Sequence, residues 1–285
     1  MSKDIILDKI KELRKLTGTG FKDCSVALKE CNGDIDKSIE YLRIKGISRA
    51  TKKMERTANE GLICITDLKK SSSILEINCE TDFVAKNNDF INFCEELSKL
   101  NFNNKGNLEN LKKAKMRDDL TVDENLIKLI SKIGEKITIS RCDFINYKES
   151  NNFCYVHNSI KKNIGKLGVI VSIKSKDNDK IILDFGKKLA MHVAATNPIA
   201  IDINDINVKI IEKEKKIIEE ELKNSGKPKN IIDKISQGRL AKFKQENSLL
   251  NQFWILDPKK KIKEIINELK IDISIQNFVR YKIGN

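Results

Sequence analysis

Histidine is almost absent from this 285-residue chain, which has only two, and the motifs that usually organise catalytic side chains are missing. Two histidines leave general acid-base chemistry with little to draw on, and neither a GxSxG nor an HExxH pattern occurs. The glycine-lysine pairs at Gly165 and Gly226 lack the spacing, and the Ser or Thr after the lysine, of a phosphate-binding loop. The sequence therefore predicts a protein that catalyses no covalent reaction and needs no cofactor.

Long apolar runs and paired cysteines are also lacking. No run reaches the roughly 18 residues of a transmembrane helix, and residues 1–7 have neither a signal-peptide core nor an Arg- and Ser-rich transit pattern. The cysteines are odd in number and contain no CxxC pair, so we interpret them as buried thiols in a reducing compartment and expect no metal site. They are Cys24, Cys31, Cys64, Cys79, Cys94, Cys142 and Cys154. We expect a soluble, cytoplasmic protein that does not bind membranes.

Positive charge is in excess but is not concentrated. The formal net charge is +13, while Lys, Asp and Glu are interspersed along most of the chain and no long basic block or Arg-rich, aromatic-interleaved patch occurs. The charge favours an acidic partner surface or RNA-rich surroundings.

Residues 1–46 have the pattern of three short amphipathic helices. The first places Ile6, Ile10 and Leu13 on one face, because spacings of four and three residues return to the same side of a helix. Glycine-containing turns separate the helices, which together predict a miniature bundle. Residues 47–58 contain several basic and few apolar residues, and we expect them to form a linker.

The middle of the chain alternates between strand-like and helix-like segments. The order strand, strand, helix occurs twice, which predicts an α+β fold with two related halves and antiparallel sheets, over residues 59–145 and 146–204. Residues 99–122 have no strong motif and are expected to connect elements. The expected strands are 62–65, 73–79, 136–144, 153–157 and 168–173, and the expected helices are one that contains Phe90 and one over 178–196.

Residues 205–245 differ in kind from this body. Apolar residues at three-and-four spacing form two stripes, separated by a helix stop that ends at Pro228. We expect an antiparallel helical hairpin that projects from the body. Residues 246–285 then return to the second half, with expected strands at 253–256 and 275–283.

The run Thr81-Asp-Phe-Val-Ala85 stands where a strand is expected to end and a helix to begin. An exposed Phe83 at this junction is suited to wedging into another protein. The ordinary alternative is a core residue at a helix start, because apolar side chains are mostly buried.

Four segments resemble signatures of the bacterial elongation factor Ts family, in the same order. They are LRKLTGTGFKDCSVALKECNGDIDKSIEYLR at residues 13–43, TDFVA at 81–85, MHVAA at 191–195 and SGKPKNIIDKISQGRLAKF at 225–243. The resemblance implies a ubiquitin-associated-like N-terminal module, a coiled-coil hairpin, and guanine-nucleotide exchange on elongation factor Tu, bound in its GDP and nucleotide-free forms. A protein that binds the nucleotide-free GTPase more tightly weakens nucleotide binding by the same factor without making a bond. Direct contact with nucleic acid is not required.

Within this resemblance, Phe83 would be pushed into the partner's GTPase domain near its Mg²⁺, and Asp82 would contact polar groups beside it. Thr81 and Val84 would fix the strand-to-helix turn. Displacing the loops that support Mg²⁺ weakens nucleotide binding, because the ion neutralises the phosphate charge and joins it to the GTPase.

Arg14, Phe21 and His192 match other partner-binding positions of the family. Arg14 and Phe21 would dock on a surface helix of the GTPase domain, and His192 would contact the partner's far β domain. Without the resemblance, Arg14 is a solvated charge, Phe21 a bundle-core ring and His192 a satisfied, half-buried residue.

Two other functions stay open from the sequence. One is a basic RNA- or ribosome-binding protein without exchange activity, and the other is a ubiquitin-type module fused to an unrelated α+β body. Some family members continue into a further C-terminal helix that contacts the partner. The sequence given stops directly after the last expected strand, so the sequence leaves such a contact open.

Overall fold

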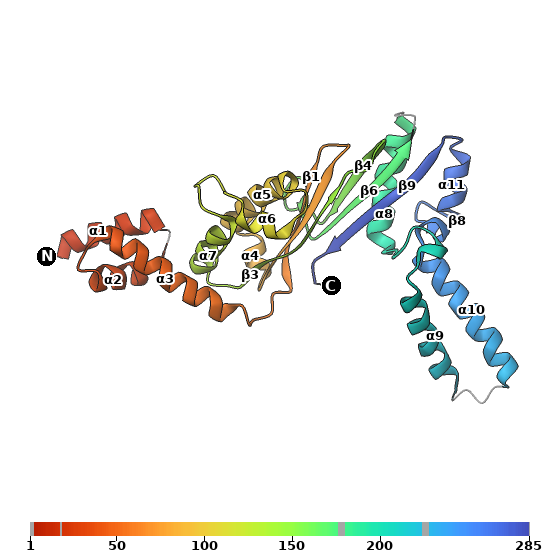
Figure 1. The fold of residues 1–285 in the computed structure, drawn as a ribbon, viewed down its shortest axis with the longest axis horizontal. Coiled ribbons are helices and arrows are strands. Elements are labelled where there is room, and N and C mark those ends of the chain that lie inside the picture. Colours follow the sequence, from red (N-terminus) through yellow and green to blue (C-terminus); the bar gives the residue numbers. More distant parts are fainter. Residues whose placement is uncertain (1–2, 18, 176–179, 224–227, 285) are drawn as a thin grey trace.

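A computed structural model describes residues 3–17, 19–175, 180–223 and 228–284. Its α+β architecture begins with three helices at one end, continues into antiparallel sheets covered by helices, and includes a long helical pair that projects from the other end (Figure 1). Within these ranges, every helix is too short or too polar to span a bilayer.

The N-terminal helices are α1 (Lys3–Thr17), α2 (Phe21–Glu30) and α3 (Ile35–Lys53). They enclose a small core of their own, made of Ile10, Leu13, Cys24, Ala27, Leu28 and Leu42. Ile6, which the periodicity places on the inner face, is 40% exposed. The segment 47–58, expected as a linker, is helical through Lys53, because α3 continues beyond the bundle and packs against the body. Residues 47–53 of the expected linker are thus helical.

The first sheet has the strand order β3-β2-β1-β5 and is antiparallel throughout. It consists of β1 (Glu60–Asp67), β2 (Ser72–Cys79), β3 (Ile137–Ile145) and β5 (Ile164–Gly165). The helices α4 (Asp82–Ala85), α5 (Asn88–Asn103), α6 (Leu108–Lys113) and α7 (Val122–Ile133) share its apolar core. Strand β5 comes from the segment expected in the second half, so the boundary expected at residue 145 does not separate the two sheets.

Helix α7 was not expected, and α6 lies within the segment 99–122 that was expected only to connect elements. Both ends of α7 carry local signals. Thr121 and Glu124 form a capping box at its start, and Gly134, with a φ of 90°, ends it in the left-handed conformation. These signals were available in the sequence.

The second sheet has the order β4-β6-β9 and is also antiparallel. Its strands are β4 (Ser150–His157), β6 (Leu167–Ser175) and β9 (Ile273–Lys282). Helix α8 (Lys180–Thr196) packs on it and shares its apolar core with α11 (Ile262–Glu268); the start expected for α8 at 178 lies outside the described residues. A small ribbon of β7 (Phe253–Trp254) and β8 (Asp257–Lys261) and the short helices η1 (Ile203–Asp205) and η2 (Leu249–Asn251) complete this part.

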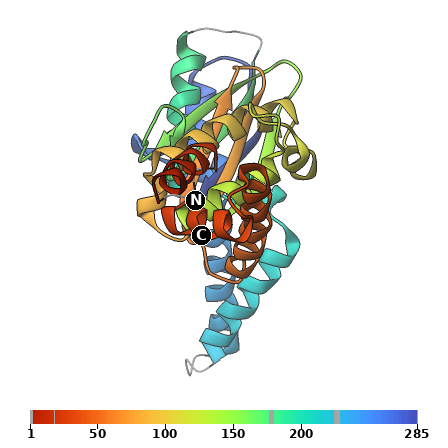
Figure 2. The same ribbon diagram turned by 90° about the vertical axis from the view of Figure 1, so that its left-hand side faces the viewer.

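The remaining helices, α9 (Val208–Lys223) and α10 (Lys229–Asn247), pack against each other as the expected hairpin. They extend away from the sheets in both views (Figures 1 and 2). Pro228 is the N-cap of α10, as expected for a proline at a helix start. An ion pair of 2.7 Å between Arg239 and Glu221 joins the two helices.

Candidate functional site

The turn that carries Phe83 is fixed at its start by Thr81. This residue is the N-cap of α4, and its hydroxyl oxygen accepts a hydrogen bond of 3.4 Å from the Val84 amide. Its own amide and hydroxyl donate hydrogen bonds of 3.1 and 2.8 Å to the two carboxylate oxygens of Glu135. Glu135 lies between α7 and β3. The turn is therefore attached to a second, distant segment of the first half.

The same turn is anchored on its inner side. Val84 and Ala85 are buried in the core of the first sheet, and Phe90, in the first turn of α5, is completely buried. Because adjacent residues of a helix point in different directions, burial of Val84 directs Phe83 outward. The Phe83 side chain is 79% exposed. It is therefore an aromatic side chain held out in solvent by a rigid turn, and not the core residue of the alternative interpretation.

Asp82 lies beside Phe83 and forms an ion pair of 2.8 Å with Lys86, four residues later. The hydrogen bond from Lys86 lowers the pKa of Asp82 below its ordinary value. The carboxylate is thus ionised at neutral pH. Because both side chains are about half exposed or more, the pair can be opened by another polar group at little cost.

Arg14 and Phe21 lie on the N-terminal helices. Arg14 is in the last turn of α1 and is exposed, and Phe21 is the first residue of α2 with an exposed fraction of 49%. Phe21 does not belong to the core cluster of the bundle. Both side chains are therefore available at the surface.

His192 has a different environment, because its side chain is completely buried in α8. Its Nε2 lies 2.9 Å from the Gln252 Oε1, and its Nδ1 accepts a hydrogen bond of 3.4 Å from the Ile255 amide. These two partners assign the proton to Nε2. The ring stacks on Trp254 with 5.4 Å between the centroids. Burial lowers the pKa of His192, opposed by the hydrogen bond to Gln252.

His192 therefore cannot touch another protein in this conformation. The contacts of His192 with Gln252, Trp254 and Ile255 fix the position of β7 and of the turn that follows it. Apolar side chains of this segment are exposed to solvent. We call the exposed residues Met191, Phe253, Ile255 and Leu256 the β7 surface. The second signature, MHVAA, thus lies next to a solvent-exposed apolar surface, although its histidine lies below it.

Three residues that hold these sites were not expected: Glu135 beneath Thr81, and Gln252 and Trp254 around His192. An acid directly after a helix-ending glycine is a weak local signal for Glu135, but 54 residues separate it from Thr81. The partner of His192 lies 60 residues away. Helix and strand periodicity in the sequence relates only residues that are close along the chain, so it cannot predict either of these two contacts. Among the described residues, no group of three or more His, Cys, Asp or Glu is placed to hold a metal ion.

Comparison with known proteins agrees with this architecture. The sequence model of the family described as Elongation factor TS matches residues 80–285, more than half of the chain. The elongation factor Ts of Bartonella bacilliformis is 37% identical over 280 residues, which cover 96% of this chain and 91% of that protein. The factors of Methylorubrum extorquens and Rickettsia felis are each 38% identical over 280 residues, covering 96% of this chain and 91% and 90% of those proteins. The chain therefore belongs to the elongation factor Ts family, and it is a translation factor that promotes nucleotide exchange on elongation factor Tu without covalent chemistry of its own.

Proposed function

We propose that Phe83 is the group with which this chain opens the nucleotide site of elongation factor Tu, by entering the GTPase domain and displacing the loops that support Mg²⁺. The observation that carries the proposal is the 79% exposure of Phe83 on a turn that is held by Thr81 and by the buried Val84. An exposed aromatic ring is costly to keep in water, and a rigid turn loses little conformational entropy when the ring enters a partner.

The energy available from one ring is sufficient for a measurable effect. A buried Phe contributes roughly 150–250 Å² of contact, and an interface anchor of this kind is worth about 2 kcal/mol or more. If this contact forms only with the nucleotide-free partner, GDP affinity falls by about thirtyfold, since each 1.4 kcal/mol is a factor of ten. Removal of Mg²⁺ from the phosphates adds to this effect.

Asp82, Thr81 and Val84 have supporting roles in this proposal. Asp82 exchanges its exposed partner Lys86 for polar groups of the GTPase, while Thr81 and Val84 keep the turn in place. Arg14 and Phe21 contact a surface helix of the GTPase domain. His192 acts through the β7 surface, which would face the far β domain of the partner. The complex forms with GDP-bound and nucleotide-free partner, and needs neither nucleic acid nor a membrane.

We also infer that the N-terminal helices form a ubiquitin-associated-like module and that the two sheets are related halves. In support, β1, β2 and α5 in the first half correspond in order to β4, β6 and α8 in the second. Each helix packs on its own sheet. The helical pair α9 and α10 is then an insertion into the second half, because β9 returns to pair with β6 after it.

Stopped-flow release of fluorescent GDP from elongation factor Tu tests the role of Phe83. We expect Phe83→Ala to lower the maximal release rate by roughly tenfold or more, since it removes an anchor of about 2 kcal/mol. Leu68→Ala is a matched control, because Leu68 is also exposed but follows β1 at the end of the sheet opposite α4. Equal release rates for Phe83→Ala and the parent chain would refute the proposal.

A further inference from the structure

Helix α3 contacts α7 along a single face. On α3 the residues of this contact are Arg43, Gly46, Ala50 and Lys53, at spacings of three, four and three. Residues Glu124, Ser131 and Gly134 face them on α7 and at its end. Such spacing places side chains on one side of a helix over nearly three turns. We call this contact the α3–α7 seam.

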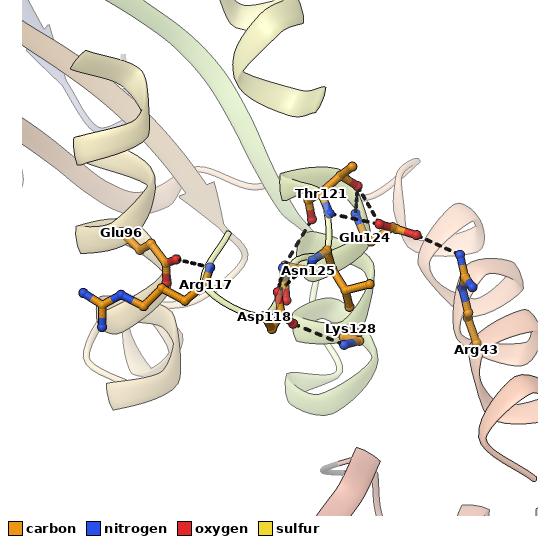
Figure 3. A network of polar contacts seen from close by, with 9 residues as sticks. Arg43, Glu96, Arg117, Asp118, Thr121, Glu124, Asn125 and Lys128 are labelled. Carbon is orange, nitrogen blue, oxygen red and sulfur yellow. Dashed lines mark hydrogen bonds and ion pairs between the residues drawn. The ribbon is translucent and has the colours of Figure 1, made fainter. Parts of the chain in front are cut away.

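An ion pair lies at the first end of the seam (Figure 3). The Arg43 Nη2 donates to the Glu124 Oε1 over 2.7 Å, while the Glu124 Oε2 accepts from the Thr121 amide over 2.9 Å in the capping box of α7. One carboxylate therefore caps α7 and binds α3. The start of α7 is braced further by Asn125, which donates to Asp118 over 2.8 Å. An exposed ion pair contributes little stability. Because the Glu124 carboxylate is held in place by the capping box, however, the pair fixes where Arg43, and with it α3, lies relative to α7.

The middle of the seam depends on a missing side chain. A Cβ at Gly46 would lie 2.8 Å from the Ser131 Oγ and 3.6 Å from the Ser131 Cβ. The two helices approach so closely here that only glycine fits without a shift of Ser131. Because glycine lowers the stability of a helix interior by about 1 kcal/mol relative to alanine, its place here is explained by packing and not by helix formation.

Residues 134–136 tie the far end of the seam to the Phe83 turn. The Lys53 ammonium donates to the Gly134 carbonyl, and the Glu135 carboxylate accepts both hydrogen bonds from Thr81. The Lys136 Nζ donates to the carbonyls of Met54 and Arg56, each over 2.7 Å, directly after α3. The Lys136 amide also donates to Glu80, the residue before Thr81, over 2.6 Å. Three consecutive residues thus bind both α3 and the turn.

Among the described side chains, Ala50 is the residue of α3 that belongs to the core of the first sheet. The module has a core cluster separate from that of the first sheet, and a groove of about 360 Å³ lies beside the seam, with Leu16, Leu42 and Ile127 among its lining residues. Among the described residues, the contacts of the seam and of residues 134–136 hold the module against the body (Figure 1).

We propose that the seam makes the N-terminal module and the Phe83 turn one rigid body, with Arg43, Gly46 and Lys136 as positioning residues for exchange. This inference rests on the proposed roles of Phe83 and the module surface in binding elongation factor Tu. Two surfaces held at a fixed geometry bind with a higher effective concentration than two surfaces on a free joint. Loosening the seam weakens capture of the partner, while the rate of GDP release within the bound complex is unchanged because Phe83 stays on its own turn.

Small changes at Gly46 and Ser131 test this proposal in the full chain. Gly46→Ala strengthens the helix but places a Cβ against Ser131, and Ser131→Ala removes the clashing oxygen. We expect Gly46→Ala to raise the KM for elongation factor Tu severalfold with kcat retained within about twofold, and the double variant to restore the parent KM. Gly46→Leu places the same Cβ against Ser131 with a larger side chain behind it, and should raise the KM by roughly tenfold or more, as effective concentration is lost. Lys37→Leu, on the exposed part of the same helix, is the matched control.

Small-angle X-ray scattering of the free chain gives a second readout that does not need the partner. The parent and Lys37→Leu should fit the single conformation of the structure, and Gly46→Leu should require several module orientations. Circular dichroism checks that the module remains helical. A parent curve that fits only a mixture of orientations, or an unchanged KM in Gly46→Leu, would overturn the proposal. Phe83→Ala should lower kcat and leave the scattering curve unchanged. A wrong role for Phe83 would therefore be distinguished from a wrong role for the seam.

Discussion

The hydroxyl of Tyr281, in the last strand of the second sheet, donates a hydrogen bond of 2.7 Å to Asp143 in β3 of the first sheet. The Arg141 guanidinium lies 4.1 Å over the Tyr281 ring and also forms a 2.7 Å ion pair with the buried Glu76. Burial, together with the neighbouring Asp143 carboxylate, raises the pKa of Tyr281. These contacts join the two sheets next to an apolar cluster of Ile63, Ile65, Ile74, Ile145 and Ile170.

Tyr281→Phe should therefore weaken the joint between the halves. The variant removes one hydrogen bond to a charged acceptor and leaves Asp143 without this donor, so we expect a loss of about 1–3 kcal/mol in the free energy of unfolding. Urea denaturation measures it. Tyr155→Phe is the matched control, because the hydrogen bond of the Tyr155 hydroxyl, to His157, lies at the exposed surface of the same sheet. A loss no larger than that of the control would show that the joint depends on the apolar cluster alone.

Glu135→Ala should reduce exchange although Glu135 lies below the proposed contact surface. The change removes both acceptors of Thr81 and frees the turn that carries Phe83. We expect the maximal rate of GDP release to fall roughly tenfold, equivalent to about 1.4 kcal/mol. Glu135→Gln keeps one acceptor for Thr81 and should lie between the parent and Glu135→Ala. Glu109→Ala, an exposed acid on α6, is the control. Full activity in Glu135→Ala would mean that the turn is rigid without this anchor.

His192 should make stability depend on pH below neutrality. Its pKa is lowered in the folded protein by burial, so the unfolded chain binds more protons as the pH falls through the ordinary histidine pKa of about 6.5. Stability from this residue is complete above that pH and is lost progressively below it. The urea midpoints of the parent chain and of His192→Gln are measured between pH 8 and 5.5. Because the carboxylates titrate in both proteins, their contribution cancels in the difference, which then reports His192 alone. A parallel pH dependence in the two proteins would contradict this assignment.

Local patterns in the sequence determined much of the fold. Apolar spacing predicted α1, α2, the strands of both sheets other than β5, and the hairpin of α9 and α10, since each of these segments carries its own period. The TDFVA run was correctly placed at the end of a strand and the start of a helix. The capping box and the glycine stop of α7 are equally local signals.

Tertiary structure decided the features that matter most for the site. No local pattern states whether Phe83 points inward or outward in a helix of four residues; burial of Val84 decides it. Burial of His192 depends on Gln252 and Trp254, and the rigidity of the Phe83 turn depends on Glu135, all far away in sequence. Residues 47–53 of the expected linker continue α3, and Ala50 joins the core of the first sheet, which no local pattern predicts. Periodicity reports the side of an element that is buried, whereas only packing between distant segments selects the partner that buries it.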